Sequence, residues 1–238
     1  MRTSMSQRGQ SATEFLIVFP MLVLLVFGII QFALIYQARA TLNNATLLAA
    51  RAGALHNGDN SEMRAALASG LAPLFAHQPS MPGYVSALTE AKLETAALSN
   101  MTQIDVLNPT RAALRDFGRN RADGQGGREL PSDTLSYRSS APGGSSGISV
   151  QDANILHVRV SYCVRLIVPV IDRVIHAGAN ALSPFSPALA ANGMQDPFGT
   201  GGATMSTDCI NPVFRGPRIV IRSEAMVRMQ SPFYESNL

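Results

Sequence analysis

The first sixty residues carry a hydrophobic pattern that changes character partway along. Residues 15–36 are apolar, with Gln31 as the one strongly polar interruption. From about residue 42 onward, apolar residues recur every three or four positions with polar residues between them, which is typical of an amphipathic helix. A His-Asn-Gly sequence at residues 56–58 is a helix-ending signal. The pattern predicts one helix over residues 10–56 whose outer half needs a partner surface.

A second pattern, the alternation of apolar and polar residues, predicts β-strands late in the chain. It holds over residues 156–168, where Cys163 falls on the polar face, and over residues 218–229. Each run predicts a strand with one buried face. Weaker signals predict helices at about residues 61–75, 84–98 and 110–117 and a short strand at 104–107.

The expected short helices include two specific assignments. Ser61 is a suitable cap for the helix over residues 61–75. In the helix that follows, Val85, Leu88 and Leu93 align as the apolar face.

Two segments rich in Gly, Ser and Pro, residues 118–149 and 176–217, are predicted to be mobile loops. Together the elements predict an α+β fold. It has a long N-terminal helix, two or three shorter helices, and a small antiparallel sheet packed on the outer half of the first helix.

Residues 15–36 are long enough to cross a membrane. As a helix rising about 1.5 Å per residue they reach about 33 Å, compared with a hydrocarbon core of about 30 Å. Pro20 and Gly28 are expected points of flexibility, and both residue types are tolerated in membrane helices. Arg2 and Arg8 precede the span, which favours a cytoplasmic N-terminus and an outward-facing remainder.

A cleaved signal peptide is an alternative interpretation of the same segment. Ala38, Arg39 and Ala40 could form its small-x-small cleavage site. However, the apolar run is longer than a signal peptide needs, begins with a carboxylate and continues into a helix. We therefore favour an uncleaved membrane span.

The most informative residue is Glu14, a carboxylate at the mouth of this apolar segment. An ionised group there is costly unless a partner or water meets it, so it marks a candidate functional site. Cleavage of the bond between Gly9 and Gln10 would place a new amino terminus one helical turn from Glu14 and supply such a partner. The alternative is a border residue whose side chain reaches the lipid headgroups.

Composition and charge exclude several classes of function. The formal net charge of +3 comes from arginines spread along the chain without a basic cluster, so no nucleic-acid partner is expected. Neither Cys163 nor Cys209 belongs to a C-x-x-C motif or lies at ligand spacing from a histidine, so we expect no metal and no cofactor. Outside the cytoplasm the two cysteines predict one disulfide, with two unpaired thiols as the alternative.

The sequence contains no recognisable catalytic constellation. Residues 143–147 spell G-x-S-x-G, but a nucleophile elbow needs a buried strand before it and a helix after it, whereas Ser145 lies in a low-complexity segment. His157, His176 and Asp172 would be its partners, although nothing in the sequence brings them together. We expect no enzyme activity and keep a hydrolase using Ser145 as a minor alternative.

The N-terminal residues resemble a known family. Gly9 and Gln10, followed by Glu14 and an apolar helix containing Pro20, are similar to the class III signal sequence of type IV pilins and pseudopilins. With the Ala-Ala-Arg-Ala-Gly segment at residues 49–53, they resemble more narrowly the TadE family, minor pseudopilins of the tight-adherence (Flp) pilus machinery. The resemblance implies that a prepilin peptidase cuts after Gly9 and that Glu14 docks subunits by facing a neighbour's terminal amine.

These inferences predict a domain organisation and a function. Residues 1–9 form a cytoplasmic leader, residues 10–57 the long helix, and residues 58–238 a periplasmic head. By the resemblance, the protein is a minor pilin or pseudopilin of the bacterial inner membrane that helps assemble or prime a tight-adherence pilus. Its partners would be prepilin peptidase, other pilins and pseudopilins, inner-membrane assembly proteins and membrane lipid. The alternative is a membrane-anchored periplasmic binding module that does not enter a pilus and recognises its partner through residues 176–217.

Overall fold

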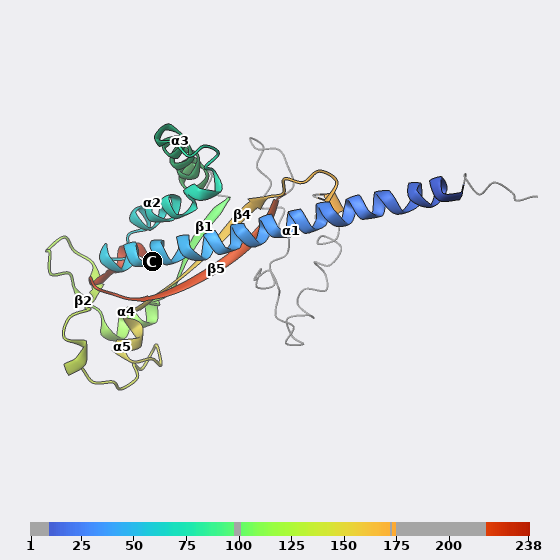
Figure 1. Cartoon of the computed structure of the whole chain (residues 1–238). Helices are drawn as coiled ribbons and strands as arrows, with labels where there is room; N and C mark the ends of the chain where they lie inside the picture. Colours follow the sequence, from blue (N-terminus) through green and yellow to red (C-terminus); the bar gives the residue numbers. More distant parts are fainter. Residues whose placement is uncertain (1–9, 98–100, 172, 175–217) are drawn as a thin grey trace, which may run out of the picture.

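The computed structural model describes residues 10–97, 101–171, 173–174 and 218–238. Its longest element is helix α1 (Gln10–Leu55), which confirms the predicted continuous helix and runs without interruption through Pro20. We call the labelled elements other than α1 the head. In Figure 1 the C-terminal half of α1 lies against the head, and its N-terminal half projects beyond it. The helix therefore has a bare half and a packed half.

The packed half of α1 carries small residues where other elements come close. A Cβ added to Gly70 of helix α2 (Asn60–Leu71) would lie 2.6 Å from the Cα of Ala45, so the two helices approach closely there. The buried face of this half is wide because α1 contacts both α2 and the sheet. Leu55, the last residue of the helix, is exposed. The buried apolar residues of this half are Ile35, Ala38, Leu42, Ala45, Ala49, Ala50 and Ala54.

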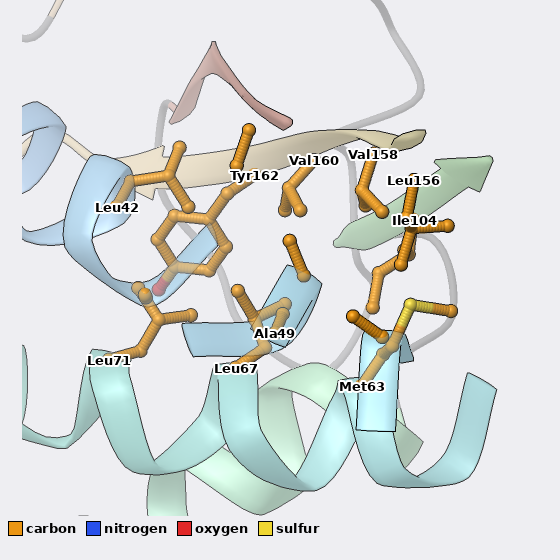
Figure 2. Close-up of a cluster of buried hydrophobic side chains, with 14 of the residues drawn as sticks. Leu42, Ala49, Met63, Leu67, Leu71, Ile104, Leu156, Val158, Val160 and Tyr162 are labelled. Atoms are coloured by element: carbon orange, nitrogen blue, oxygen red, sulfur yellow. The ribbon is translucent and has the colours of Figure 1, made fainter. Parts of the chain in front are cut away.

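The main sheet is antiparallel and has the strand order β1 (Thr102–Asn108), β4 (Ile155–Arg165), β5 (Arg218–Arg228). Its two long strands confirm the alternating patterns in the sequence, and their register pairs Tyr162 with Ile221. Figure 2 shows how the inward residues of β4 meet α1 and α2 to form the core. The core residues labelled there are Leu42, Ala49, Met63, Leu67, Leu71, Ile104, Leu156, Val158, Val160 and Tyr162. The α+β fold is thus confirmed.

The short helices lie near their expected positions, with two corrections. Helix α2 is capped by Asp59 and not by Ser61, because the cap precedes the first helical residue and the Asp59 carboxylate accepts a hydrogen bond from Ser61 N at 2.8 Å. In helix α3 (Met81–Lys92) the buried residues are Ala87 and Ala91, and Leu88 is half-buried. Val85 is exposed, as is Leu93 beyond the end of the helix. Helix α3 packs on α2 with only a narrow face covered, so the larger side chains remain outside.

Helix α4 (Arg111–Phe117) confirms the prediction at residues 110–117, and the Thr110 hydroxyl caps it by accepting a hydrogen bond from Ala113 N at 3.2 Å. The short helix α5 (Val150–Ala153) precedes β4 directly. A 3-10 turn (Ala72–Leu74) extends α2, and a π-helical turn (Leu93–Ala97) extends α3.

A second, smaller sheet occupies part of the region that we expected to be a loop. It has the strand order β2 (Arg119–Asn120), β3 (Arg128–Leu130), β6 (Phe233–Tyr234). A 3-10 turn (Leu135–Tyr137) follows β3, and Leu130 is fully buried. Strands of two or three residues are too short to show an alternating pattern, which explains why residues 118–149 look irregular in the sequence. Their mobility stays a prediction.

The C-terminal segment is fastened to the end of α1. The helix ends in two left-handed residues, Asn57 at φ 58° and Gly58 at φ 77°, as the Asn-Gly sequence predicts. The Asn57 side-chain amide donates a hydrogen bond to Pro232 O at 2.7 Å, and Ser231 N donates to Ala54 O at 3.1 Å. This junction joins residues that are far apart in sequence, and a short 3-10 turn (Glu235–Asn237) closes the chain.

Cys163 lies on the same side of β4 as Arg159 and Ser161, as the alternation predicts, but it is buried there. It is 5% exposed and packs with Met101 and Val220, because the chain leading into β1 covers it and Cys163 N donates a hydrogen bond to Met101 O at 2.9 Å. Cys209 and residues 176–217 lie outside the described residues. The disulfide and the second mobile loop therefore stay predictions.

Candidate functional site

The bare half of α1 presents a continuous band of large apolar side chains to its surroundings. Within the described residues, the stretch Glu14–Leu55 is the one helix long and apolar enough to cross a membrane, by length and composition. A band of this size is typical of a surface that lipid or protein covers, and it fits a single-pass membrane anchor. The exposed side chains are Phe15, Leu16, Ile17, Val18, Phe19, Met21, Leu22, Leu24, Leu25, Val26, Ile29, Ile30 and Phe32.

Glu14 lies on α1 one helical turn after Gln10, and its side chain is exposed. The neighbouring rings of Phe15 and Phe19 stack with their centroids 5.1 Å apart. The structure thus places the carboxylate at the tip of the projecting helix, at the start of the apolar band. Gly9 lies outside the described residues, so the processing bond and the docking role of Glu14 stay predictions.

The two residues expected to give flexibility both lie inside α1. Helix α1 is assigned continuously through Pro20 and Gly28. A Cβ added at Gly28 would meet nothing within 4 Å, so packing inside this molecule does not require glycine there. Their effect on helix flexibility stays a prediction.

Gln31, which the sequence showed only as a polar interruption, has a specific structural role. Its side chain is fully buried, and its Oε1 accepts hydrogen bonds from Ile167 N at 3.1 Å and Val168 N at 2.8 Å. These bonds fasten the chain that leaves β4 to the side of α1, within the segment predicted to span the membrane. No sequence signal could identify the partners, because they are backbone groups more than a hundred residues away.

A buried polar cluster inside the head was also missed by the sequence analysis. The Tyr162 hydroxyl donates a hydrogen bond to Glu94 Oε2 at 2.5 Å, and Arg218 Nη2 lies 3.3 Å from Glu94 Oε1. Arg218 also donates to Cys163 O at 3.0 Å. Burial, followed by the nearby Glu94 carboxylate, raises the pKa of the Tyr162 hydroxyl above its ordinary value. The cluster ties the end of α3 to β4 and β5, which is a structural role.

The outward face of the main sheet carries an exposed ion-pair group. Glu224 lies 2.7 Å from Arg159 Nε and 2.8 Å from His157 Nε2. The hydrogen bond from Arg159 is the main cause that lowers the pKa of the Glu224 carboxyl. His157 is therefore part of a cross-strand pair on a wet sheet face.

The G-x-S-x-G segment forms a turn around an acidic side chain. Ser145 N and Ser146 N donate to the Asp116 carboxylate at 3.0 Å and 2.7 Å. The Ser146 side chain is the main cause that lowers the pKa of Asp116, and these backbone hydrogen bonds lower it further. In the described part of the chain, no hydrogen bond links Ser145 to a histidine, and no group of His, Cys, Asp and Glu could hold a metal ion. Asp172 and His176 lie outside that part.

The family model of TadE-like proteins matches residues 9–51. This N-terminal segment is TadE-like. The TadE-like segment includes the whole apolar band of α1 and most of its packed half, among them Ala45 and Ala49. The match associates the protein with tight-adherence pilus systems in general and with a membrane-anchored location. No curated protein and no solved structure matches the chain.

Proposed function

We propose that the protein is a minor pilin or pseudopilin that helps assemble or prime a tight-adherence pilus after cleavage by a prepilin peptidase. The observation that carries the proposal is the combination found in α1. One helix holds the TadE-like match, projects a bare apolar half with Glu14 at its tip, and packs its other half into a folded head. This is the arrangement that a subunit needs to move from a membrane into a helical bundle of like subunits.

The role of Glu14 follows from the cost of its position. A carboxylate in an apolar assembly is stable only with a positive, hydrogen-bonded partner. Cleavage between Gly9 and Gln10 would supply an amine on every subunit, at the same end of the helix as Glu14. The amine of one subunit can then meet the carboxylate of its neighbour and set the axial stagger between them.

The orientation belongs to the same proposal. Arg2 and Arg8 precede the span, so the leader is cytoplasmic, where the peptidase cuts, and the head is periplasmic. Under this proposal the protein is a substrate of an enzyme and not itself an enzyme. The partners are the prepilin peptidase, other pilins and pseudopilins, and inner-membrane assembly proteins.

The test has two measurements: the N-terminal residue of the mature protein and the presence of the protein in the assembled pilus complex. In cells that contain the peptidase and the pilus machinery, N-terminal sequencing is expected to give Gln10, and a Gly9→Val variant is expected to keep Met1. Glu14→Gln keeps the shape of the side chain without its charge, so cleavage should continue while the protein disappears from the assembled pilus complex. Ser11→Ala, a neighbouring change without loss of charge, serves as the matched control and should assemble.

Four outcomes would contradict the proposal or a part of it. Finding Met1 intact in the wild-type protein would indicate an unprocessed anchor, and finding Thr41 would indicate a secreted protein. Normal assembly of Glu14→Gln would remove the docking role from Glu14. If pilus formation does not depend on the protein at all, the membrane-anchored binding module is the better interpretation.

A further inference from the structure

The outward side of strand β4 is mostly polar, whereas the chain directly after the strand is apolar on that side. Along β4 the outward residues are polar, among them His157, Arg159 and Ser161. Beyond the strand, Leu166, Val168 and Ile171 are buried, at 3%, 8% and 8% exposure. The residues between and after them, Ile167, Val170 and Val174, are apolar and exposed, at 67%, 54% and 60%. Residues 166–171, which we call the apolar turn, are thus apolar on both sides, and Val174 continues their exposed side.

The position of the turn along α1 determines how deep the turn lies in a membrane that α1 spans. Gln31 holds Ile167 and Val168 by their backbone N–H groups, so the turn lies beside residue 31 of the helix. With Phe15 at the inner edge of the membrane, Gln31 lies about 24 Å further along the axis, near the outer edge of a hydrocarbon core of about 30 Å. The turn therefore reaches the level of the outer leaflet.

Several features of the turn suit that level. Backbone N–H groups at membrane depth must find acceptors, and the Gln31 side chain satisfies two of them. Tyr36, a little over one helical turn above Gln31, is 76% exposed, as aromatic residues at a membrane interface are. Arg165, directly before the turn, is exposed and can reach lipid headgroups.

The backbone of the turn is also strained in a way that keeps an apolar side chain outside. Val170 adopts φ 72°, which a β-branched residue rarely does. Such a conformation is unfavourable for a β-branched residue and persists where the surrounding structure enforces it. Here it directs the chain so that Ile171 packs inward and Val170 stays exposed.

We propose that the apolar turn inserts into the outer leaflet of the membrane that α1 spans, so that the head has a second, lipid-facing contact and cannot rotate freely about α1. The occupant of this surface is lipid because the surface is continuous with the membrane-spanning band of the helix and lies at the same level. The proposal depends on α1 spanning a membrane and not on the protein's entry into a pilus.

The chain contains no tryptophan, so a single introduced tryptophan reports its own surroundings. The full-length protein is reconstituted in phosphatidylcholine–phosphatidylglycerol vesicles as Ile167→Trp or Met226→Trp. Met226 is a matched control, because it is 64% exposed on the outward face of the same sheet. It pairs with His157, ten residues before Ile167 along the chain, which separates the two probes by about 33 Å if the chain stays extended.

Lipids brominated in their acyl chains are expected to quench Ile167→Trp several-fold more than Met226→Trp, and iodide in the water is expected to do the reverse. Equal iodide quenching of both probes without quenching by the brominated lipid would overturn the proposal. Shielding of Ile167→Trp from iodide that disappears when the protein is diluted in lipid would also overturn the proposal. It would show that a second copy of the chain, and not lipid, covers the turn. Circular dichroism checks that the variants fold, and Val174→Trp replaces Ile167→Trp, with the same expectations, if that variant does not.

Discussion

Glu94, Tyr162 and Arg218 come from three separate elements and meet inside the head. All three side chains are almost completely buried, so the Glu94 carboxylate depends on Tyr162 and Arg218 for its hydrogen bonds. A buried group that loses its partner costs about 1–3 kcal/mol. Loss of a single polar atom from the cluster should therefore weaken the packing of the end of α3 on the main sheet.

Replacing Tyr162 by Phe removes one hydroxyl and leaves Glu94 Oε2 without that donor. The variant is expected to lose about 1–3 kcal/mol of unfolding free energy near neutral pH, measured by chemical denaturation in detergent. The matched control is Tyr137→Phe, because Tyr137 is 92% exposed and its change should be neutral. A loss of equal size in both variants would contradict the role of the cluster.

The same residue predicts a pH dependence with a definite sign. The pKa of Tyr162 is raised in the folded state above its ordinary value of 10.0, chiefly by burial. Below that value the tyrosine is neutral in both states and its contribution to stability is complete. Above it the unfolded state loses the proton first, so stability falls as pH rises. Tyr162→Phe should lack this part of the alkaline loss, which denaturation at pH 9 and pH 11 would show; an identical loss in both proteins would contradict it.

Single residues are also where prediction from the sequence failed most clearly. Gln31 looked like an interruption of an apolar run, but it is the acceptor for two backbone groups from beyond β4. Cys163 was placed on a wet face, but the chain before β1 covers it. Both errors have one physical cause, since the partner in each case comes from a distant part of the chain that periodicity does not describe.

At the level of elements, prediction succeeded where a pattern extends over many residues. The long helix and the strands β4 and β5 repeat their signals over many residues each, so isolated exceptions do not hide them. The strands β2, β3 and β6 have no such redundancy, because they are two or three residues long and held by tertiary packing. For α3 the element was found, but its buried face depends on how it lies on α2.

The junction between α1 and the C-terminal segment gives a prediction that separates backbone strain from packing. A Cβ at Gly58 would lie 2.1 Å from the Phe233 ring, and its φ of 77° is already unfavourable for alanine. Gly124 has a similar φ of 71° but open space around it, so Gly124→Ala carries the backbone cost of about 1 kcal/mol alone. Gly58→Ala should be more destabilising by at least another 1–3 kcal/mol, as overpacked sites are.

Thermal unfolding followed by circular dichroism compares the two variants directly. The larger loss in Gly58→Ala should be accompanied by faster amide exchange at Tyr234 N, which donates to Asn57 O at 3.2 Å. Equal losses would mean that the C-terminal segment does not constrain the end of α1.

At the scale of the whole molecule, α1 belongs to two environments, and the division falls near residue 33. Its buried apolar residues begin at Ile35, so the packed half is part of the head and not a stalk that carries it. Gln31 links the bare half to the head through its hydrogen bonds to Ile167 N and Val168 N. The membrane half can therefore be removed with little loss of core.

A fragment that begins at Ala33 is expected to be soluble and to unfold cooperatively, because it keeps every buried apolar residue of α1. In that fragment the apolar turn loses the Gln31 acceptor, so the amides of Ile167 and Val168 should exchange rapidly. A fragment that begins at Asn57 lacks the face on which α2, β4 and β5 pack, and it should not fold. Leu42→Ala in the longer fragment tests with a single residue whether α1 is part of the core. Leu42 is fully buried, so the variant should lose about 2–5 kcal/mol of unfolding free energy. Cooperative folding of the shorter fragment would show that α1 is only an anchor; failure of the longer one would show that the head needs the membrane half.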